Sequence, residues 1–210
     1  MMAHNLPLTP RPALTPPIND QDHSLGPIDA PVQLVMFGDY ECPHCQAAEA
    51  NAQDLLRMYP QNIRFVWRHF PLAKVHPLAR HAALAAEVAH AKGLFWQMHA
   101  LLFSRSPQLA RDHLTHYAIE LGLDPAAFSA ALDDPTLSAT LQQHIKSGVQ
   151  SGVNKTPTFY IQGLRFNGTY DIASLEPAVL AAADIANPPK TIPPPDANTP
   201  PALSMTEPRK

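Results

Sequence analysis

The pattern of apolar and polar positions between residues 32 and 68 predicts a strand, a helix and a second strand. Residues 32–38 form a nearly continuous apolar run ending in glycine, which is typical of a strand buried on both faces. Residues 43–59 contain no proline or glycine after the first position and carry apolar residues at helical spacing. Across residues 63–68 every second residue is large and apolar, as in a strand. Together these segments predict a βαβ unit.

Helical spacing then dominates residues 76–150. Apolar residues recur at intervals of three and four in four stretches, namely residues 78–89, 94–101, 114–121 and 137–149. We therefore expect a helical insertion at about residues 76–150. Strand patterns return at Thr158–Gln162 and Leu164–Phe166, with Gly163 as a hairpin turn between them, and residues 172–186 predict a closing amphipathic helix.

Proline divides the chain into three parts. The 24 prolines of the 210-residue chain are concentrated towards its two ends. Residues 1–30 are interpreted as a Pro-rich N-terminal extension, residues 31–186 as one domain, and residues 187–210 as a Pro-rich tail. We expect the tail to be disordered, because few large apolar side chains are present to offset the entropy of ordering.

Charge and hydropathy narrow the class of protein. The formal net charge is -3, and Lys and Arg are scattered singly, so nothing indicates binding to nucleic acid or to an anionic membrane. No apolar run approaches the roughly 20 residues needed to span a bilayer. The first thirty residues lack the apolar core of a secretory signal, so we expect a cytoplasmic protein, with a periplasmic or other extracytoplasmic location open if a leader has been removed.

The candidate chemistry lies in Cys42-Pro43-His44-Cys45, which contains both cysteines of the chain. If Cys42 is the N-cap and Pro43 the first helical residue, the Cys42 sulfur can accept a hydrogen bond from the Cys45 N–H. The helix dipole and a protonated His44 also favour thiolate over thiol. We predict that Cys42 is the nucleophile, that Cys45 is the resolving thiol, and that His44 sets the oxidising strength.

Other uses of the cysteine pair fit the sequence less well. A disulfide across four residues would stabilise the fold by only about 2 kcal/mol, which makes a poor staple. A zinc site needs two more ligands, and the best pair, His113 and His116, is spaced too tightly. We therefore predict no metal, and no cofactor beyond a redox-active Cys42–Cys45 disulfide. A non-catalytic binding module stays an alternative, although it would not need Cys45.

Four polar residues near the predicted strand ends are interpreted without catalytic roles. Asp39 and Glu41 flank the cysteine motif and are interpreted as solvated loop acids. The alternative is that Glu41 raises the pKa of Cys42 by like-charge repulsion. Arg68 and His69 are interpreted as structural, because a strand exit needs no titratable group.

Several segments, in the same order along the chain, resemble one known family. They are Asp22-His23 with Gly26-Pro27 and Ala30-Pro31, residues 37–45 around the cysteines, Arg68-His69-Phe70-Pro71-Leu72, His76-Pro77, residues 93–99, and residues 152–159 around Thr156-Pro157. The family is the DsbA-like thiol-disulfide oxidoreductases, and the resemblance covers about residues 22–186. It implies an α/β, thioredoxin-like fold with an inserted helical subdomain.

The resemblance also implies a function. It predicts an enzyme that exchanges disulfides with protein or peptide substrates and is recycled by a redox partner that stays unknown. It further implies that the Thr156–Pro157 bond is cis and that this loop faces the disulfide and binds an extended peptide by strand addition. Residues 1–30 are too short for a dimerisation domain, so we expect a monomer. In a reducing cytosol the dithiol would reduce or isomerise disulfides.

Overall fold

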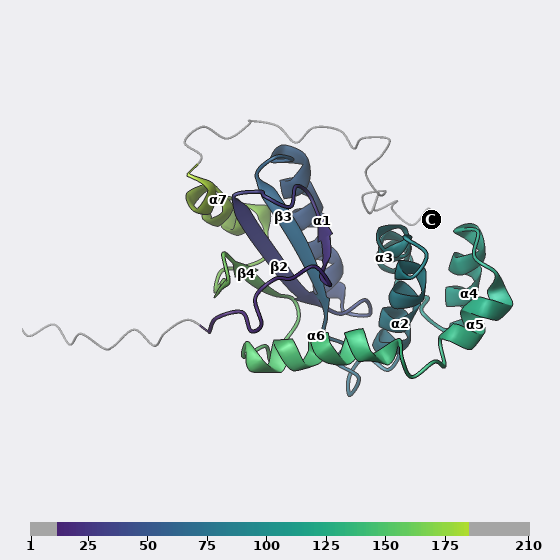
Figure 1. The fold of residues 1–210 in the computed structure, drawn as a ribbon. Coiled ribbons are helices and arrows are strands. Elements are labelled where there is room, and N and C mark those ends of the chain that lie inside the picture. Colours follow the sequence, from purple (N-terminus) through teal and green to yellow (C-terminus); the bar gives the residue numbers. More distant parts are fainter. Residues whose placement is uncertain (1–11, 185–210) are drawn as a thin grey trace, which may run out of the picture.

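A single mixed sheet forms the centre of the molecule (Figure 1). The computed structural model describes residues 12–184, and within them the strand order is β1-β3-β2-β4-β5. The central pair β2 and β3 is parallel, and the other neighbouring pairs are antiparallel. The strands are β1 (His23–Leu25), β2 (Val32–Gly38), β3 (Ile63–His69), β4 (Thr158–Ile161) and β5 (Leu164–Arg165).

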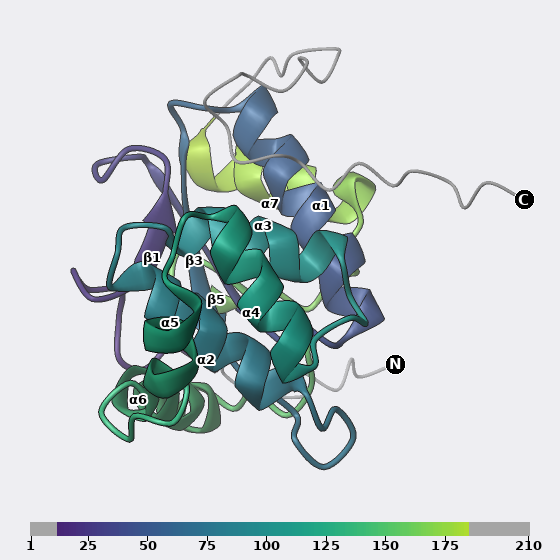
Figure 2. The same cartoon turned by 90° about the vertical axis from the view of Figure 1, so that its right-hand side faces the viewer.

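Helices connect and cover the strands as the apolar spacing predicts. The first, α1 (Pro43–Met58), joins the parallel strands β2 and β3 and completes the βαβ unit. Five helices between β3 and β4 form the insertion, which faces the viewer in Figure 2. They are α2 (Ala79–His90), α3 (Phe95–Ser104), α4 (Arg111–Glu120), α5 (Pro125–Ala131) and α6 (Ser138–Gln150), and α7 (Ile172–Ala183) closes the described chain.

Strand β2 is buried on both faces, which explains its continuous apolar run. Leu34 and Met36 belong to a large core shared with α1, α7 and the insertion. Val35 and Phe37 point to the other face and belong to a smaller core that also contains Leu14 and is packed by Ile145 of α6. The sheet therefore separates two helix-covered layers, and the fold is thioredoxin-like with a helical insertion, as predicted.

The hairpin between β4 and β5 follows the predicted turn. Gln162 and Gly163 form a two-residue loop with φ values of 51° and 74°. Two consecutive positive φ values are the geometry of a type I′ turn, which glycine adopts without steric cost. Each strand ends one residue earlier than the sequence pattern indicates.

The structure adds elements that the sequence pattern does not reveal. Strand β1 has three residues and α5 has seven, both too short for a clear periodic signal. Residues 12–30, assigned from sequence to the N-terminal extension, include β1 and a backbone hydrogen bond of 2.8 Å from the Leu14 N–H to the Gly163 carbonyl. The folded unit thus begins before residue 31. The predicted tail, residues 187–210, lies outside the described residues.

Candidate active site

Cys42 stands at the junction between the β2 loop and α1. The helix begins at Pro43, which occupies the first turn as predicted. The predicted sulfur cap is wrong, because the Cys42 side chain makes no capping hydrogen bond. The Cys45 N–H instead donates to the Cys42 carbonyl oxygen at 2.9 Å.

Both thiols are free, and their environments shift their pKa values in opposite directions. The neighbouring Cys45 thiol chiefly lowers the pKa of Cys42 to about 5, with smaller contributions from the backbone of Cys45 and the side chain of Thr156, against the effect of burial. Burial first, and then the neighbouring Cys42, raise the pKa of Cys45 well above its usual value. At neutral pH Cys42 is therefore the thiolate and Cys45 the thiol.

The loop at Thr156 and Pro157 lies against the cysteines although it is distant in sequence. The Thr156–Pro157 peptide bond is cis. The Cys42 Sγ lies 3.7 Å from the Thr156 carbonyl oxygen, to which its thiol can donate. This loop therefore forms one wall of the candidate site.

A groove with a volume of about 410 Å³ opens beside this loop. Its walls are residues 155–159, residues 165–170 and His44. The His44 Nδ1 lies 2.7 Å from the Tyr170 hydroxyl, and the Tyr170 carbonyl accepts a hydrogen bond of 3.0 Å from the Asn51 amide. His44 lowers the pKa of Cys42 through its backbone, while its imidazole is paired with Tyr170.

Asp39 contacts both cysteines, and its interpretation as a solvated acid is wrong. The residue is 2% exposed. Its N–H donates to the Cys45 Sγ at 3.4 Å, and its carbonyl accepts from the Cys42 N–H at 3.2 Å. Its carboxylate Oδ2 accepts from the Leu72 N–H at 2.8 Å and pairs with His76 Nδ1 at 2.9 Å. Asp39 therefore connects the cysteines to the loop after β3.

Glu41 is held in a similar way and is also not a solvated acid. It is half-buried, and its Oε2 accepts a hydrogen bond of 2.7 Å from the Leu78 N–H. Sequence reasoning missed His76 and Tyr170 as neighbours of the motif, because each comes from a loop far along the chain. The one signal in the sequence for a contact with the cysteines is the position of Asp39, three residues before Cys42.

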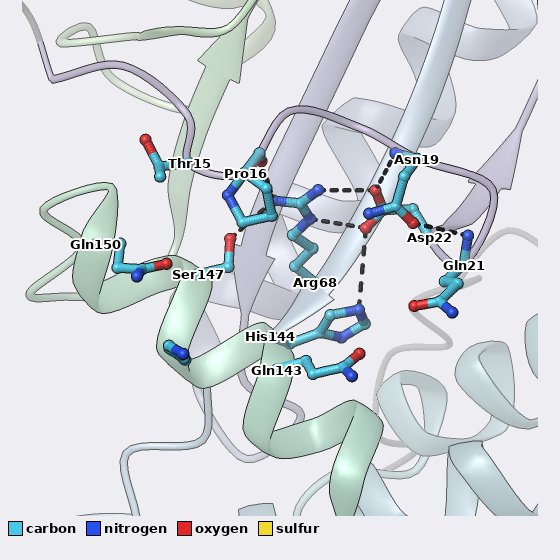
Figure 3. Close-up of a pocket in the computed structure, with 11 residues that line it drawn as sticks. Thr15, Pro16, Asn19, Gln21, Asp22, Arg68, Gln143, His144, Ser147 and Gln150 are labelled. Carbon is cyan, nitrogen blue, oxygen red and sulfur yellow. Dashed lines mark hydrogen bonds and ion pairs between the residues drawn. The ribbon is translucent and has the colours of Figure 1, made fainter.

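Arg68 has a structural environment, as expected. Its guanidinium donates two bonds of 2.7 Å to the Asp22 carboxylate. It also donates to the Pro16 carbonyl at 2.9 Å, the Pro17 carbonyl at 3.1 Å and the Ser147 hydroxyl at 2.7 Å. All five N–H groups of the side chain are used. Arg68 lies between the N-terminal segment and α6 (Figure 3). It lines a cavity with a volume of about 370 Å³.

The zinc alternative gains no support from the part of the chain that the structure describes. His113 and His116 lie on α4, with side chains 44% and 67% exposed. Within residues 12–184, four potential ligand atoms lie within 4.8 Å of one another in a group without either cysteine: His23, His69, Glu87 and His144.

These features define a DsbA-like protein of the thioredoxin fold. The chain belongs to the Thioredoxin family, whose family model matches residues 19–180. It is similar to BdbD from Bacillus subtilis, with a TM-score of 0.72, 21% identity and coverage of 83% of this chain and 97% of that one. It is also similar to a thioredoxin-like oxidoreductase from Silicibacter pomeroyi DSS-3, with a TM-score of 0.70, 28% identity and coverage of 80% and 95%.

Curated relatives match this chain over part of their own length. A Na(+)/H(+) antiporter NhaA 1 of Salinispora arenicola is 43% identical over 163 residues, 78% of this chain and 25% of the relative. NhaA of Herminiimonas arsenicoxydans is 39% identical over 179 residues, 85% of this chain and 28% of the relative. The chain thus spans about a quarter of the length of these relatives. Within residues 12–184, no helix combines the length and apolarity needed to cross a membrane.

Proposed function

We propose that this protein is a thiol-disulfide oxidoreductase that exchanges disulfides with protein or peptide substrates through Cys42-Pro43-His44-Cys45. The observation that carries the proposal is the placement of two free thiols in one turn at the start of α1, with the Thr156–Pro157 loop beside the Cys42 sulfur. The pKa of Cys42 is lowered to about 5, whereas that of Cys45 is raised well above its usual value. One sulfur is therefore ready to attack at neutral pH, and the other is held in reserve as a thiol.

The exchange has two steps. In the reducing direction, the Cys42 thiolate attacks one sulfur of a substrate disulfide, and the other substrate sulfur leaves as a thiolate that takes up a proton. Cys45 then loses its proton and attacks the Cys42 sulfur, which breaks the mixed disulfide and forms the Cys42–Cys45 disulfide. The substrate leaves as a dithiol, and the oxidised protein performs the reverse reactions with a substrate dithiol.

The Thr156–Pro157 loop is the proposed substrate contact. Its Thr156 carbonyl lies beside the Cys42 sulfur, and the groove of about 410 Å³ continues from it. Pro157 supplies no N–H for pairing within the sheet, so the adjoining Thr156 backbone is available to an extended peptide. Pro43 and His44 are exposed beside the nucleophile, on the side a substrate would approach.

Trapping of the mixed disulfide tests the function. Cys45→Ser should accumulate a covalent adduct with a peptide that contains one disulfide, because the resolving step is removed. Cys42→Ser, its matched control, should form little adduct. Equal adduct formation by both variants, or by neither, would refute the assignment and favour a binding module without exchange chemistry.

The reduction potential decides the physiological direction. A stabilised Cys42 thiolate favours the reduced form and hence oxidation of substrate thiols. Equilibration of the full chain with glutathione buffers measures this potential. A reduction potential more oxidising than that of the cellular glutathione pool fits a protein that oxidises substrates in an oxidising compartment. A more reducing potential fits a reductant that is recycled in the cytosol.

A further inference from the structure

Two histidines lie beside the cysteine pair, and the structure gives them different partners. His44 is between the cysteines in sequence, but its Nδ1 is paired with the Tyr170 hydroxyl at 2.7 Å in the wall of the groove. His76 comes from the loop after β3 and pairs with the Asp39 carboxylate at 2.9 Å. His44 is thus the histidine closest to the cysteines in sequence, whereas His76 is the one that pairs with Asp39 beside them.

His76 is linked to both cysteines through one residue, Asp39. The Asp39 carbonyl accepts from the Cys42 N–H, and the Asp39 N–H donates to the Cys45 Sγ. The Asp39 side chain is fully buried, while the His76 side chain is 21% exposed. The imidazole is thus fixed to the cysteine loop but can still exchange protons with solvent.

We propose that His76, held by Asp39, is the positioning residue that supplies positive charge to the Cys42 thiolate, and that its effect exceeds that of the His44 imidazole, which is paired with Tyr170. The proposal rests on the thiol-disulfide exchange proposed above and deepens it. It identifies which histidine couples the redox state of the cysteines to a proton.

The charges around His76 agree with this role. Burial alone would lower the pKa of His76, but it is raised, because the hydrogen bond and charge of Asp39 and the charges of Cys42 and Glu41 outweigh burial. These three groups come from the segment between β2 and α1. The three charges that raise the pKa of His76 are thus negative, and each favours the imidazolium.

The coupling must be reciprocal. If the imidazolium stabilises the thiolate, formation of the thiolate strengthens proton binding at His76 to the same extent. Reduction of the Cys42–Cys45 disulfide by a substrate dithiol takes up two electrons and one proton and leaves Cys42 as thiolate and Cys45 as thiol. His76 then binds a proton more tightly than in the disulfide form, in which no sulfur carries charge.

Alkylation of Cys42 in the reduced full chain tests the proposal. The rate of carboxamidomethylation at Cys42, followed by peptide mapping between pH 3 and 9, should reach half its maximum near pH 5 in the parent protein. His76→Gln should move this midpoint upward by about one pH unit, since the positive charge that Asp39 links to the cysteine loop is removed. His44→Gln, the matched control, should move it by less than about 0.3 unit. A larger shift in His44→Gln than in His76→Gln would overturn the proposal.

Two further measurements separate charge from loop structure. His76→Lys should restore a midpoint near that of the parent protein, because it keeps a positive charge beside Asp39. In the unaltered chain, the NMR titration of His76 should have a higher midpoint in the reduced than in the oxidised form. Equal midpoints in the two redox states would refute the coupling, even if a variant failed to fold.

Failure of this inference is distinguishable from failure of the proposed function. Trapping by Cys45→Ser reports exchange with a peptide disulfide and does not depend on His76. Adduct formation without a His76 effect would refute the inference alone. A His76 effect without adduct formation would refute the function and leave the electrostatic coupling in place.

Discussion

Histidine meets carboxylate in two regions of this molecule, with different consequences. Beside the cysteines, His76 pairs with Asp39 and keeps partial contact with solvent. In the core, Glu87 Oε1 lies 2.7 Å from His23 Nε2 and 2.8 Å from His69 Nε2, with all three side chains at most 3% exposed. The first pair can exchange a proton at neutral pH, whereas burial shields the second group from bulk water.

The direction of each pKa shift shows what the environment selects. The pKa of His76 is raised. The pKa of His69 is lowered chiefly by burial, and burial together with the neighbouring charges lowers that of His144 further. The residue type is the same in both regions, so depth and partners decide whether the pKa of an imidazole is raised or lowered.

The core group has the composition of a metal site but not its hydrogen bonding. The Trp67 indole N–H donates to His69 Nδ1 at 3.0 Å, and the His69 backbone N–H donates to His144 Nδ1 at 3.3 Å. A histidine that ligates a metal normally donates its other ring N–H instead. The ring proton of His69 is thus placed on Nε2, facing Glu87. Hydrogen bonds within this group therefore connect β1, β3, α2 and α6.

The largest expected effect separates the buried Arg68–Asp22 ion pair from the cysteine pair. Arg68→Ala removes a buried guanidinium with five hydrogen bonds and leaves the buried Asp22 carboxylate without its arginine partner. Such a loss costs about 3–5 kcal/mol in the free energy of unfolding, measured by urea denaturation.

Arg111→Ala is the control, because it removes a solvent-exposed ion pair with Asp133 and should lose only a small part of that stability. The midpoint for Cys42 alkylation should not change in either variant under native conditions. A stable Arg68→Ala protein with an altered midpoint would contradict the separation of the two regions.

The core group gives the next effect. Glu87→Ala leaves two buried histidine donors without their acceptor, so we expect a loss of about 3 kcal/mol in the free energy of unfolding. Glu87→Gln keeps an acceptor oxygen and should lose less. Loss of disulfide exchange with unchanged stability would instead assign Glu87 to the redox chemistry.

Sequence could predict the parts of this molecule that depend on local pattern. The apolar runs of β2 and β3 and the position of Pro43 determine the βαβ unit and the start of α1, and these predictions are confirmed. Contacts between distant segments could not be derived in the same way. Nothing in the sequence around Asp39 reveals that the loop containing His76 folds back onto it. The sequence therefore predicts a solvated acid where the structure has a buried one.

A pH series compares how the histidines of the two regions contribute to the free energy of unfolding. In the folded protein the pKa values of His69 and His144 are lowered. Below about pH 6.5 the unfolded chain therefore binds more protons than the folded protein, and the free energy of unfolding falls. The slope is up to about 1.4 kcal/mol per pH unit for each histidine. His76 acts in the opposite sense, because its raised pKa contributes stability below about pH 6.5 that is lost as the pH rises through its folded pKa.

Urea denaturation at pH 5, 6 and 7 measures these contributions. His144→Asn should flatten the decline in stability towards pH 5, because one group that must stay neutral is removed. His76→Gln should steepen it by a smaller amount. Parallel curves for the parent protein and both variants would show that neither histidine is linked to folding in this range.

The smallest effect concerns the exposed partner of His44. Tyr170→Phe removes the hydroxyl that holds His44 Nδ1 and leaves the aromatic wall of the groove in place. A released imidazole can move closer to the Cys42 thiolate and donate a hydrogen bond to it, so the alkylation midpoint should fall by about 0.2–0.3 pH unit. The shift is small because the hydrogen bond from Cys45, the largest contribution that lowers the pKa of Cys42, is unaffected. A shift of one unit or more would make the His44–Tyr170 pair, and not the His76–Asp39 pair, the main side-chain control of the nucleophile.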